Sequence, residues 1–272
     1  MGNIKLLNKT SIAIVGSRNN SQYGKSITQN ITKELTENDI VIISGMAKGI
    51  DSIAHKTCLK YGGKTIAVLG SGFKYIYPKE NEKLFYDILQ NDGLLISEFP
   101  LDSPVQMKNF PKRNRIISGL SVGVLVIEAA YRSGTSTTVK HAKIQGKKVF
   151  CIPNSIGNKN SYGTIDFIKN GAILVRNAQE ILKELGLNIK ERNISPNLKT
   201  KNTQVKIWDT KSHKIFDCIY KNEIIDSEGI SFKTKISISE VNQLVTMLEI
   251  EDIIECVEGN KFKLSEDYYE KM

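Results

Sequence analysis

Short apolar runs, rich in β-branched residues, alternate with longer polar segments over roughly the first two thirds of the chain. The polar segments carry apolar residues at helical spacing, as at Ile27, Ile31 and Leu35. The apolar runs are continuous, which is typical of parallel strands that are buried on both faces. The predicted strands cover residues 11–17, 40–45, 64–72, 94–98, 121–129, 147–153 and 172–175. The predicted helices cover residues 24–38, 50–63, 81–93, 110–120, 135–146, 163–171 and 177–186.

This alternation predicts an α/β fold over residues 1–187, with a doubly wound and mostly parallel sheet. Residues 188–206 lack periodicity and are predicted to be a linker. Residues 207–272 are predicted to form a small winged-helix-like domain. Their helical segments, 212–222 and 237–252, precede a short hairpin with a Gly-Asn turn.

Charge is divided unequally between these regions. The whole chain of 272 residues has a net charge of +9. Residues 207–272 hold 8 lysines and 14 acidic residues, a net −6, so residues 1–206 hold 30 basic and 15 acidic residues, a net +15. A large basic domain favours a polyanionic partner, although a lysine-rich composition alone would also produce it.

Glycines and small hydroxyl residues follow four of the predicted strands. Parallel strands bring their carboxyl ends to one edge of the sheet, where ligands bind in doubly wound folds. Backbone N–H groups and helix N-termini at such turns favour an anion, and glycine lets a phosphate approach closely. We expect the following residues to form a phosphate-binding edge: Gly16, Ser17, Arg18, Ser44, Gly45, Lys48, Gly70, Ser71, Ser133, Gly134 and Thr135.

A basic run with an aromatic residue inside it precedes the strand at 121–129. A basic groove with an aromatic platform is how proteins hold single-stranded nucleic acid without reading its sequence. We expect Arg113 and Arg115 to contact phosphate, and their joint removal to weaken DNA binding with little loss of stability. Alternatively, Phe110 and Pro111 only pack the helix start onto the core. The expected contacts of this run are Lys108, Phe110, Lys112, Arg113, Asn114 and Arg115.

The sequence does not predict an enzyme. It has neither a GxGxxG nor a GxxxxGK[ST] motif, so a dinucleotide or a hydrolysed nucleoside triphosphate is not favoured. Its isolated carboxylates are not paired by spacing; we expect Asp51 to be a helix-start charge and Glu128 to be the partner of an arginine. No metal or cofactor is expected, because the four cysteines and three histidines are scattered.

The cysteines are expected to be buried thiols in a reducing cytoplasm. The sequence has no apolar stretch of membrane-spanning length and no signal-peptide core, so we expect a cytoplasmic protein with no membrane partner.

Six ordered blocks between about residues 10 and 185 resemble the DNA-processing protein A family, DprA or Smf: IAIVGSR, ISGMAKGIDSIAH, GSGFKYIYPKEN, LLISEFP, FPKRNRIISGLS and VLVIEAAYRSGTSTTVKHAKIQGKKVFCIP. The resemblance implies an extended Rossmann-like domain that binds and protects single-stranded DNA and loads the RecA recombinase during natural transformation. It also implies a homodimer that needs no metal or nucleotide. By motif, the GSR turn, the SGMAKGID turn, the FPKRNR run and the SGTS turn would form the DNA pocket.

The chain departs from the family pattern in three places. Its first strand begins near residue 11, so the helical domain that often precedes it is expected to be missing. The loop after VFCIP reads NSIGN where the family usually has glycine after the proline. The C-terminal domain is acidic, so we expect it to contact protein or pack against its own chain, because like charges repel a DNA backbone.

Two other functions remain open from the sequence. One is a phosphoribohydrolase acting on nucleoside monophosphates, although the RSGTSTTVK turn lacks the acid that such enzymes carry. The other is a nucleotide-signal sensor whose output is the winged helix, which a nucleotide rather than DNA would stabilise.

Overall fold

The structure, a computed structural model, describes residues 1–131, 133–188, 210–222, 224–250, 253–257 and 260–265. The chain divides into two units, Met1–Asn193 and Ile194–Met272, which are described separately below. The predicted linker at 188–206 falls, apart from its first residue, outside the described residues.

Seven parallel strands form the sheet of the described first unit, in the order β4-β3-β2-β1-β5-β6-β7. The α/β prediction is therefore confirmed. The strands are β1 Ser11–Val15, β2 Val41–Ser44, β3 Thr65–Leu69, β4 Leu94–Ser97, β5 Gly123–Val126, β6 Lys148–Cys151 and β7 Ile173–Leu174.

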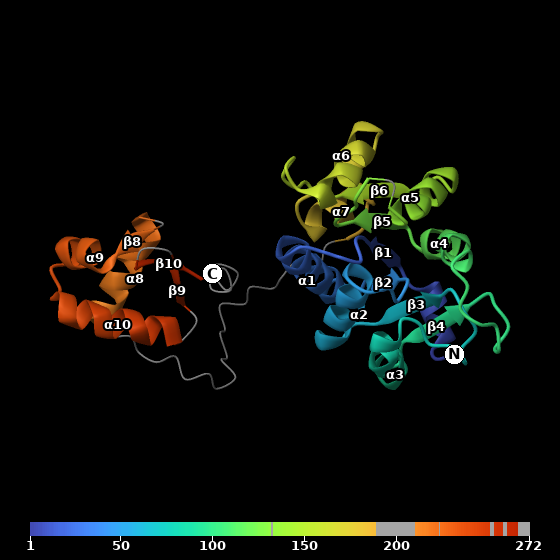
Figure 1. Cartoon of the computed structure of the whole chain (residues 1–272), viewed down its shortest axis with the longest axis horizontal. Coiled ribbons are helices and arrows are strands. Elements are labelled where there is room, and N and C mark those ends of the chain that lie inside the picture. The colour runs from blue at the N-terminus through green and yellow to red at the C-terminus, as the bar shows by residue number, and fades with distance from the viewer. Residues whose placement is uncertain (132, 189–209, 223, 251–252, 258–259, 266–272) are drawn as a thin grey trace. The chain divides into compact units, whose positions relative to one another are not determined.

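Helices cover both faces of this sheet, and the apolar residues of the central strand β1 alternate between two cores. Ile12 and Ile14 pack with the residues of α1, α2 and α7, whereas Ala13 and Val15 pack with those of α4, α5 and α6. Figure 1 shows α1 and α2 in blue, across the strands from α4 and α5 in green. The helices are α1 Gln22–Glu37, α2 Ile50–Lys60, α3 Glu82–Gln90, α4 Asn109–Leu120, α5 Thr135–Ile144, α6 Tyr162–Lys169 and α7 Ala178–Glu184.

The strand order reverses beside β1, and this reversal positions the site. The chain builds β1 to β4 outward in one direction and then returns to place β5 on the other side of β1. The loops that follow β1 and β5 therefore lead into helices on opposite faces of the sheet, which opens a crevice at their carboxyl ends.

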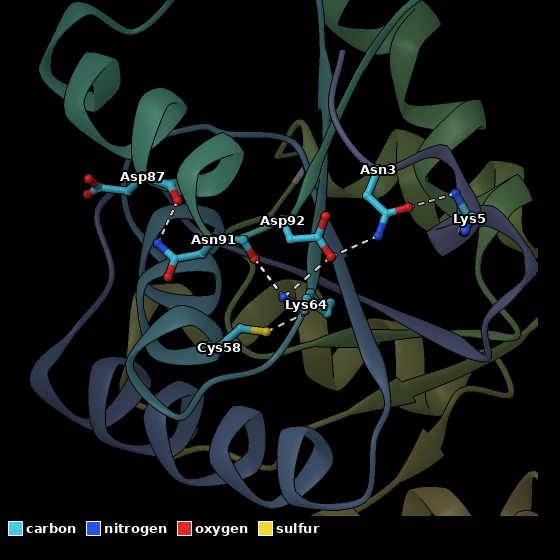
Figure 2. A network of polar contacts seen from close by, with 7 residues as sticks. All are labelled: Asn3, Lys5, Cys58, Lys64, Asp87, Asn91 and Asp92. Atoms are coloured by element: carbon cyan, nitrogen blue, oxygen red, sulfur yellow. Dashed lines mark hydrogen bonds and ion pairs between the residues drawn. The ribbon is translucent and has the colours of Figure 1, made fainter.

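The N-terminal segment pairs with the edge strand β4. Gly2 forms an antiparallel bridge with Leu94, and the amino group of Met1 donates to the Leu95 carbonyl over 2.9 Å. Figure 2 shows the adjoining polar network, in which the Lys64 ammonium lies 2.9 Å from the Asn91 carbonyl and 3.6 Å from the Asp92 carboxylate. The Asp92 carboxylate also accepts a hydrogen bond from the Asn3 amide. Figure 2 also draws Lys5, Cys58 and Asp87, which bond to Asn3, Lys64 and Asn91. A paired edge strand is protected from pairing with another chain.

The second unit has the element order of a winged helix. Its elements are α8 Thr210–Asn222, β8 Ile225–Asp226, α9 Ser227–Thr234, α10 Ile238–Ile250, β9 Ile254–Val257 and β10 Lys261–Leu264, with the strand order β8-β10-β9. The sequence pattern missed β8 and α9. A two-residue strand shows no periodicity, and α9 buries only Ile230 among its side chains.

Three of the four cysteines are buried, as expected, but Cys256 on β9 is exposed. Burial raises the pKa of the Cys58 thiol to about 11 and that of Cys151 to about 12, so both stay protonated at neutral pH. Within the described residues, no helix is long and apolar enough to cross a membrane.

His55 of α2 is buried as a neutral imidazole against β3. The Thr65 hydroxyl donates to the Ile42 carbonyl over 2.7 Å, so it accepts from Nδ1–H of His55, also at 2.7 Å. The other ring nitrogen, Nε2, has no hydrogen-bond partner. Burial, reinforced by the Arg113 charge, lowers the pKa of His55 to about 3.

We predict that His55 makes the protein less stable as the pH falls from about 6.5 towards 3. In this window the unfolded chain protonates the imidazole and the folded chain does not, so the free energy of unfolding falls by up to about 1.4 kcal/mol per pH unit. When urea unfolding is measured across this pH range, the free energy of unfolding should fall less steeply with decreasing pH for His55→Gln than for the parent. Thr65→Val is the control, because it retains the buried imidazole and should keep the same dependence of the free energy of unfolding on pH. An equal pH dependence for His55→Gln and the parent would contradict the assignment.

Candidate nucleic-acid interface

A cavity of about 490 Å³ lies at the switch point of the sheet, where the loops after β1 and β5 meet helix α4. Nine of the residues predicted to contact the ligand line it. Six come from the phosphate-binding edge and three from the basic run: Gly16, Ser17, Arg18, Ser133, Gly134 and Thr135, with Phe110, Arg113 and Asn114. Its described lining also includes Val15, Asn19, Ala47, Asp51, Met107, Pro111, Ile117, Ala130, Thr138 and Asn160.

The turn after β1 is packed tightly against the start of α2. The Ile50 N–H donates to the Ser17 carbonyl over 3.2 Å. Gly49 makes this approach possible, because it has a φ of +79° and an added Cβ would lie 2.3 Å from the Ser17 oxygen. The Gly16–Arg18 turn is thereby held at the cavity wall before any ligand arrives.

Arg113 is buried at the base of the cavity, with only 4% of its surface exposed. Its Nη1 donates to the Gly45 carbonyl over 2.7 Å and to the Val68 carbonyl, so α4 is attached to the ends of β2 and β3. Burial lowers the pKa of this guanidinium to about 10, and nearby Asp51 opposes that shift. Arg113 is therefore charged at neutral pH.

Asp51, in the first turn of α2, is the buried counter-charge of Arg113. Its Oδ2 accepts from the N–H groups of Gly45, at 3.1 Å, and Ala47, at 3.4 Å. Burial raises the pKa of the carboxyl, while Arg113 and these hydrogen bonds oppose the rise. The helix-start interpretation of Asp51 agrees with this position.

The burial of Arg113 corrects one expectation drawn from the sequence. An exposed arginine could be removed with little loss of stability, but Arg113 balances a buried carboxylate and ties down two carbonyl groups. Arg115, the other arginine of the pair, is exposed, forms an ion pair with Glu98 and is absent from the described cavity lining.

Phe110 is the aromatic side of the cavity, and its ring has both basic and aromatic neighbours. The guanidinium carbons of Arg18 and Arg113 each lie 5.9 Å from the ring centroid. The ring also packs on Gly70, where an added Cβ would lie 2.7 Å from Cδ1. Both expected roles of Phe110 are thus compatible, since it packs on the core and faces the cavity.

The segment that leads into α5 carries one hydroxyl without a described hydrogen-bond partner. The Ser133 hydroxyl is buried, lines the cavity and has no hydrogen-bond partner among the described residues. The Asn114 amide donates to the Thr137 hydroxyl over 2.7 Å, which joins α4 to α5. A helix N-terminus with an unpaired hydroxyl is suited to bind an anion.

Eight of the residues predicted to contact the ligand, five from the phosphate-binding edge and three from the basic run, lie outside the described lining. The Ser44 and Ser71 hydroxyls are buried and donate to the carbonyls of Ile14 and Tyr75, both over 2.7 Å. The Lys48 ammonium forms an exposed ion pair with Glu80 at 2.5 Å. Gly45 and Gly70 make room for Arg113 and Phe110, and three basic residues of α4 and its start are exposed: Lys108, Lys112 and Arg115.

Glu128 is fully buried, but its described hydrogen-bond donors are not arginines. Its carboxylate accepts from the N–H and hydroxyl of Ser21, at 2.9 and 2.5 Å, and from the Asn154 and Asn160 amides at 3.3 and 3.5 Å. Asn160 also donates to the Asn19 carbonyl over 2.8 Å, and both line the cavity. Asn160 is not among the residues expected from the sequence, although the polar NSIGN segment lies just before it in the same loop.

The described residues place no group of three or more His, Cys, Asp or Glu side chains for a metal ion. Arg18 and Arg113 line the cavity, with Asp51 as the one carboxylate in its described lining. Fold and site together define a class of doubly wound α/β protein with a basic, aromatic-lined cavity at the switch point, suited to an anionic ligand.

The family model described as DNA recombination-mediator protein A matches residues 1–186, and the chain belongs to this family. It is similar to Protein Smf of Escherichia coli K12, with 47% identity over 184 residues, 68% of this chain and 49% of that protein. It is also 41% identical to the DNA processing protein DprA of Bacillus subtilis, over 71% of this chain and 64% of that protein. The chain thus spans about half to two thirds of these relatives.

Two solved structures of the same family share the fold. DprA of Streptococcus pneumoniae aligns with a TM-score of 0.64 at 43% identity, over 67% of this chain and 64% of that one. DprA of Helicobacter pylori aligns with a TM-score of 0.62 at 32% identity, over 68% of this chain and 84% of that one. The second structure is described as giving the single-stranded DNA binding mode of its protein.

We predict that Arg113→Ala lowers the free energy of unfolding by roughly 3–5 kcal/mol, because it leaves Asp51 buried without its counter-charge. Arg115→Ala removes only an exposed ion pair and should lower it by no more than about 1 kcal/mol. Urea unfolding measures both. Asp51→Asn added to Arg113→Ala should recover part of the loss, and similar losses for the two single variants would contradict the buried pair.

Proposed function

We propose that this chain binds single-stranded DNA in the cavity between the loops after β1 and β5. The observation that carries the proposal is the set of groups gathered there from separate parts of the sequence. They are the exposed Arg18, the Phe110 ring and the unpartnered Ser133 hydroxyl at the start of α5. The binding described for the Helicobacter pylori relative supports the same ligand.

Each group has a distinct task in this proposal. Arg18 and the start of α5 bind phosphate, and Phe110 offers a surface on which a base can stack. Arg113 acts from beneath, as a buried charge that also holds Phe110 and the Gly45 turn in place. An unpaired base is free to stack on a protein ring, so single strands are preferred to duplex.

The wider role is that of a recombination mediator. We propose that the chain protects incoming single-stranded DNA, delivers it to the RecA recombinase during transformation or recombination, and works as a homodimer in the cytoplasm. Membership of the family supports this role. We assign the acidic residues 207–272, with a net charge of −6, to contacts with protein rather than to a second DNA-binding site.

The proposed activity is binding, without catalysis. A hydrolase of nucleoside monophosphates needs a carboxylate free to act on the ribose bond, whereas Asp51 is bound by two backbone N–H groups and balanced by Arg113. Glu128 is likewise occupied by Ser21 and two asparagines.

We predict that Arg18→Ala weakens binding of a fluorescent oligo-dT about tenfold or more, since a charge-assisted hydrogen bond contributes roughly 1.5–3 kcal/mol. Fluorescence anisotropy over a salt series should also show a slope of log K against log salt that is shallower by about 0.7. Lys183→Ala is the matched control, because it removes an exposed positive charge from the last turn of α7, at the opposite edge of the sheet. Parent-like binding by Arg18→Ala would refute the cavity assignment.

We predict no release of free base from AMP, GMP, CMP or UMP on prolonged incubation with the full chain, measured by chromatography. The expected absence follows from the occupied state of Asp51 and Glu128. Base release that is abolished by Asp51→Asn would establish the hydrolase instead. A rise in Tm with a nucleotide but not with oligo-dT would favour the signal sensor.

A further inference from the structure

A buried carboxylate that follows β5 lies against the first turn of α1. Glu128 is fully buried, and its oxygens accept hydrogen bonds from the N–H and the hydroxyl of Ser21, the N-cap residue of α1. Gly24 makes room for this contact, because an added Cβ there would lie 2.5 Å from the Glu128 carboxyl carbon. The first turn of α1 has no acidic residue of its own. Glu128 therefore supplies, from a distant part of the sequence, the negative charge that a helix N-terminus favours.

This contact decides which helix start is open to a ligand. In doubly wound proteins, the turn after the first strand and the N-terminus of the following helix commonly bind the phosphates of the ligand. Here a carboxylate of the protein itself occupies that position, at 2.9 Å from the Ser21 nitrogen and 2.5 Å from its hydroxyl oxygen. A phosphate would meet a fixed negative charge at the start of α1. The phosphates of the proposed ligand are therefore left to Arg18 and to the start of α5.

The Glu128 carboxylate also holds the loop that follows β6. It accepts from the Asn154 amide at 3.3 Å and from the Asn160 amide at 3.5 Å. Asn160 in turn donates to the Asn19 carbonyl over 2.8 Å, so this loop is joined directly to the loop that carries Arg18. The four groups that contact the carboxyl oxygens are all donors, which is the arrangement that an ionised carboxylate requires.

The loop between β1 and α1 is anchored at both of its ends. At the first end, the Ser17 carbonyl accepts from the Ile50 N–H over 3.2 Å. At the second end, Ser21 donates twice to Glu128. Three residues separate these anchors, and the first of them, Arg18, lines the cavity. The position of the Arg18 guanidinium therefore depends on whether Ser21 is held.

We propose that Glu128 is a positioning residue for DNA binding. It is absent from the described cavity lining, and it acts by fixing Ser21 directly and Asn19 through Asn160, so that Arg18 is held ready for a phosphate. This inference rests on the proposed binding of single-stranded DNA in the cavity. Its effect is opposite in sign to that of charge alone. A carboxylate near a polyanion opposes binding, whereas the loss of this carboxylate weakens binding.

The test measures binding of fluorescent oligo-dT to the full chain that carries Glu128→Gln. Glutamine keeps the size of the side chain, but it has one acceptor oxygen for donors that now share two. We expect binding about fivefold weaker than that of the parent, a smaller loss than that of Arg18→Ala. Ser21→Ala should also weaken binding, because Ser21 anchors the loop without lining the described cavity.

A double variant separates positioning from a general loss of structure. If Glu128 acts through Arg18, then Arg18→Ala with Glu128→Gln should bind as weakly as Arg18→Ala alone, within about twofold. Losses that multiply would overturn the action through Arg18. Hydrogen exchange of the free protein, followed by NMR, gives a readout without DNA. The Ser21 amide, which donates to Glu128 over 2.9 Å, should exchange faster in Glu128→Gln while the amides of the central strands stay protected.

Controls separate this inference from the function on which it rests. Glu184→Gln makes the same substitution at an exposed position at the end of α7, and it should bind like the parent. Parent-like or tighter binding by Glu128→Gln overturns the inference alone, provided that Arg18→Ala still weakens binding. If Glu128→Gln does not fold, Ser21→Ala and its combination with Arg18→Ala decide in the same way. If the parent binds no oligo-dT, the proposed function fails and this inference fails with it.

Discussion

The buried charge pair of Arg113 and Asp51 is the constraint on which the site depends. The two side chains bind the two backbone polar groups of the same residue, since Arg113 donates to the Gly45 carbonyl and Asp51 accepts from the Gly45 N–H. Arg113 also reaches the end of β3 through the Val68 carbonyl. A charge in this position must be balanced, because an uncompensated buried ion destabilises the fold. Helix α4, the start of α2 and two strand ends are therefore coupled.

This coupling separates the groups that build the cavity from those free to bind. Arg113, Ser44 and Ser71 use their donors on backbone carbonyls, and Lys48 is engaged by Glu80. The exposed Arg18 and the unpartnered Ser133 hydroxyl retain capacity for a ligand. A rigid base with few free donors costs little reorganisation on binding, and this suits the proposed binding of a flexible single strand.

The chemistry of the surface agrees with a polyanion as the ligand of the first unit. Tyr77, Phe110 and Arg18 form an aromatic and cationic series in which adjacent ring centres lie 5.4 Å apart and the guanidinium carbon lies 5.9 Å from the Phe110 ring. In the proposed function, such a surface would contact bases by their faces and phosphates by charge, without reading the sequence. The acidic composition of residues 207–272 contrasts with it and favours a different class of partner.

By itself, the sequence determined the α/β class, the parallel strands, the edge of the sheet where the cavity lies and nine of the residues that line this cavity. These features follow from apolar runs and from glycine turns, which act over a few neighbouring positions. Only the tertiary structure decided which of the polar side chains are free. Arg113 and Arg115 are two positions apart on one helix, yet one lies buried over Gly45 and the other pairs with Glu98 in solvent. The residues that surround these two arginines are distant from them in the sequence, so the local spacing of the sequence does not predict which arginine is buried.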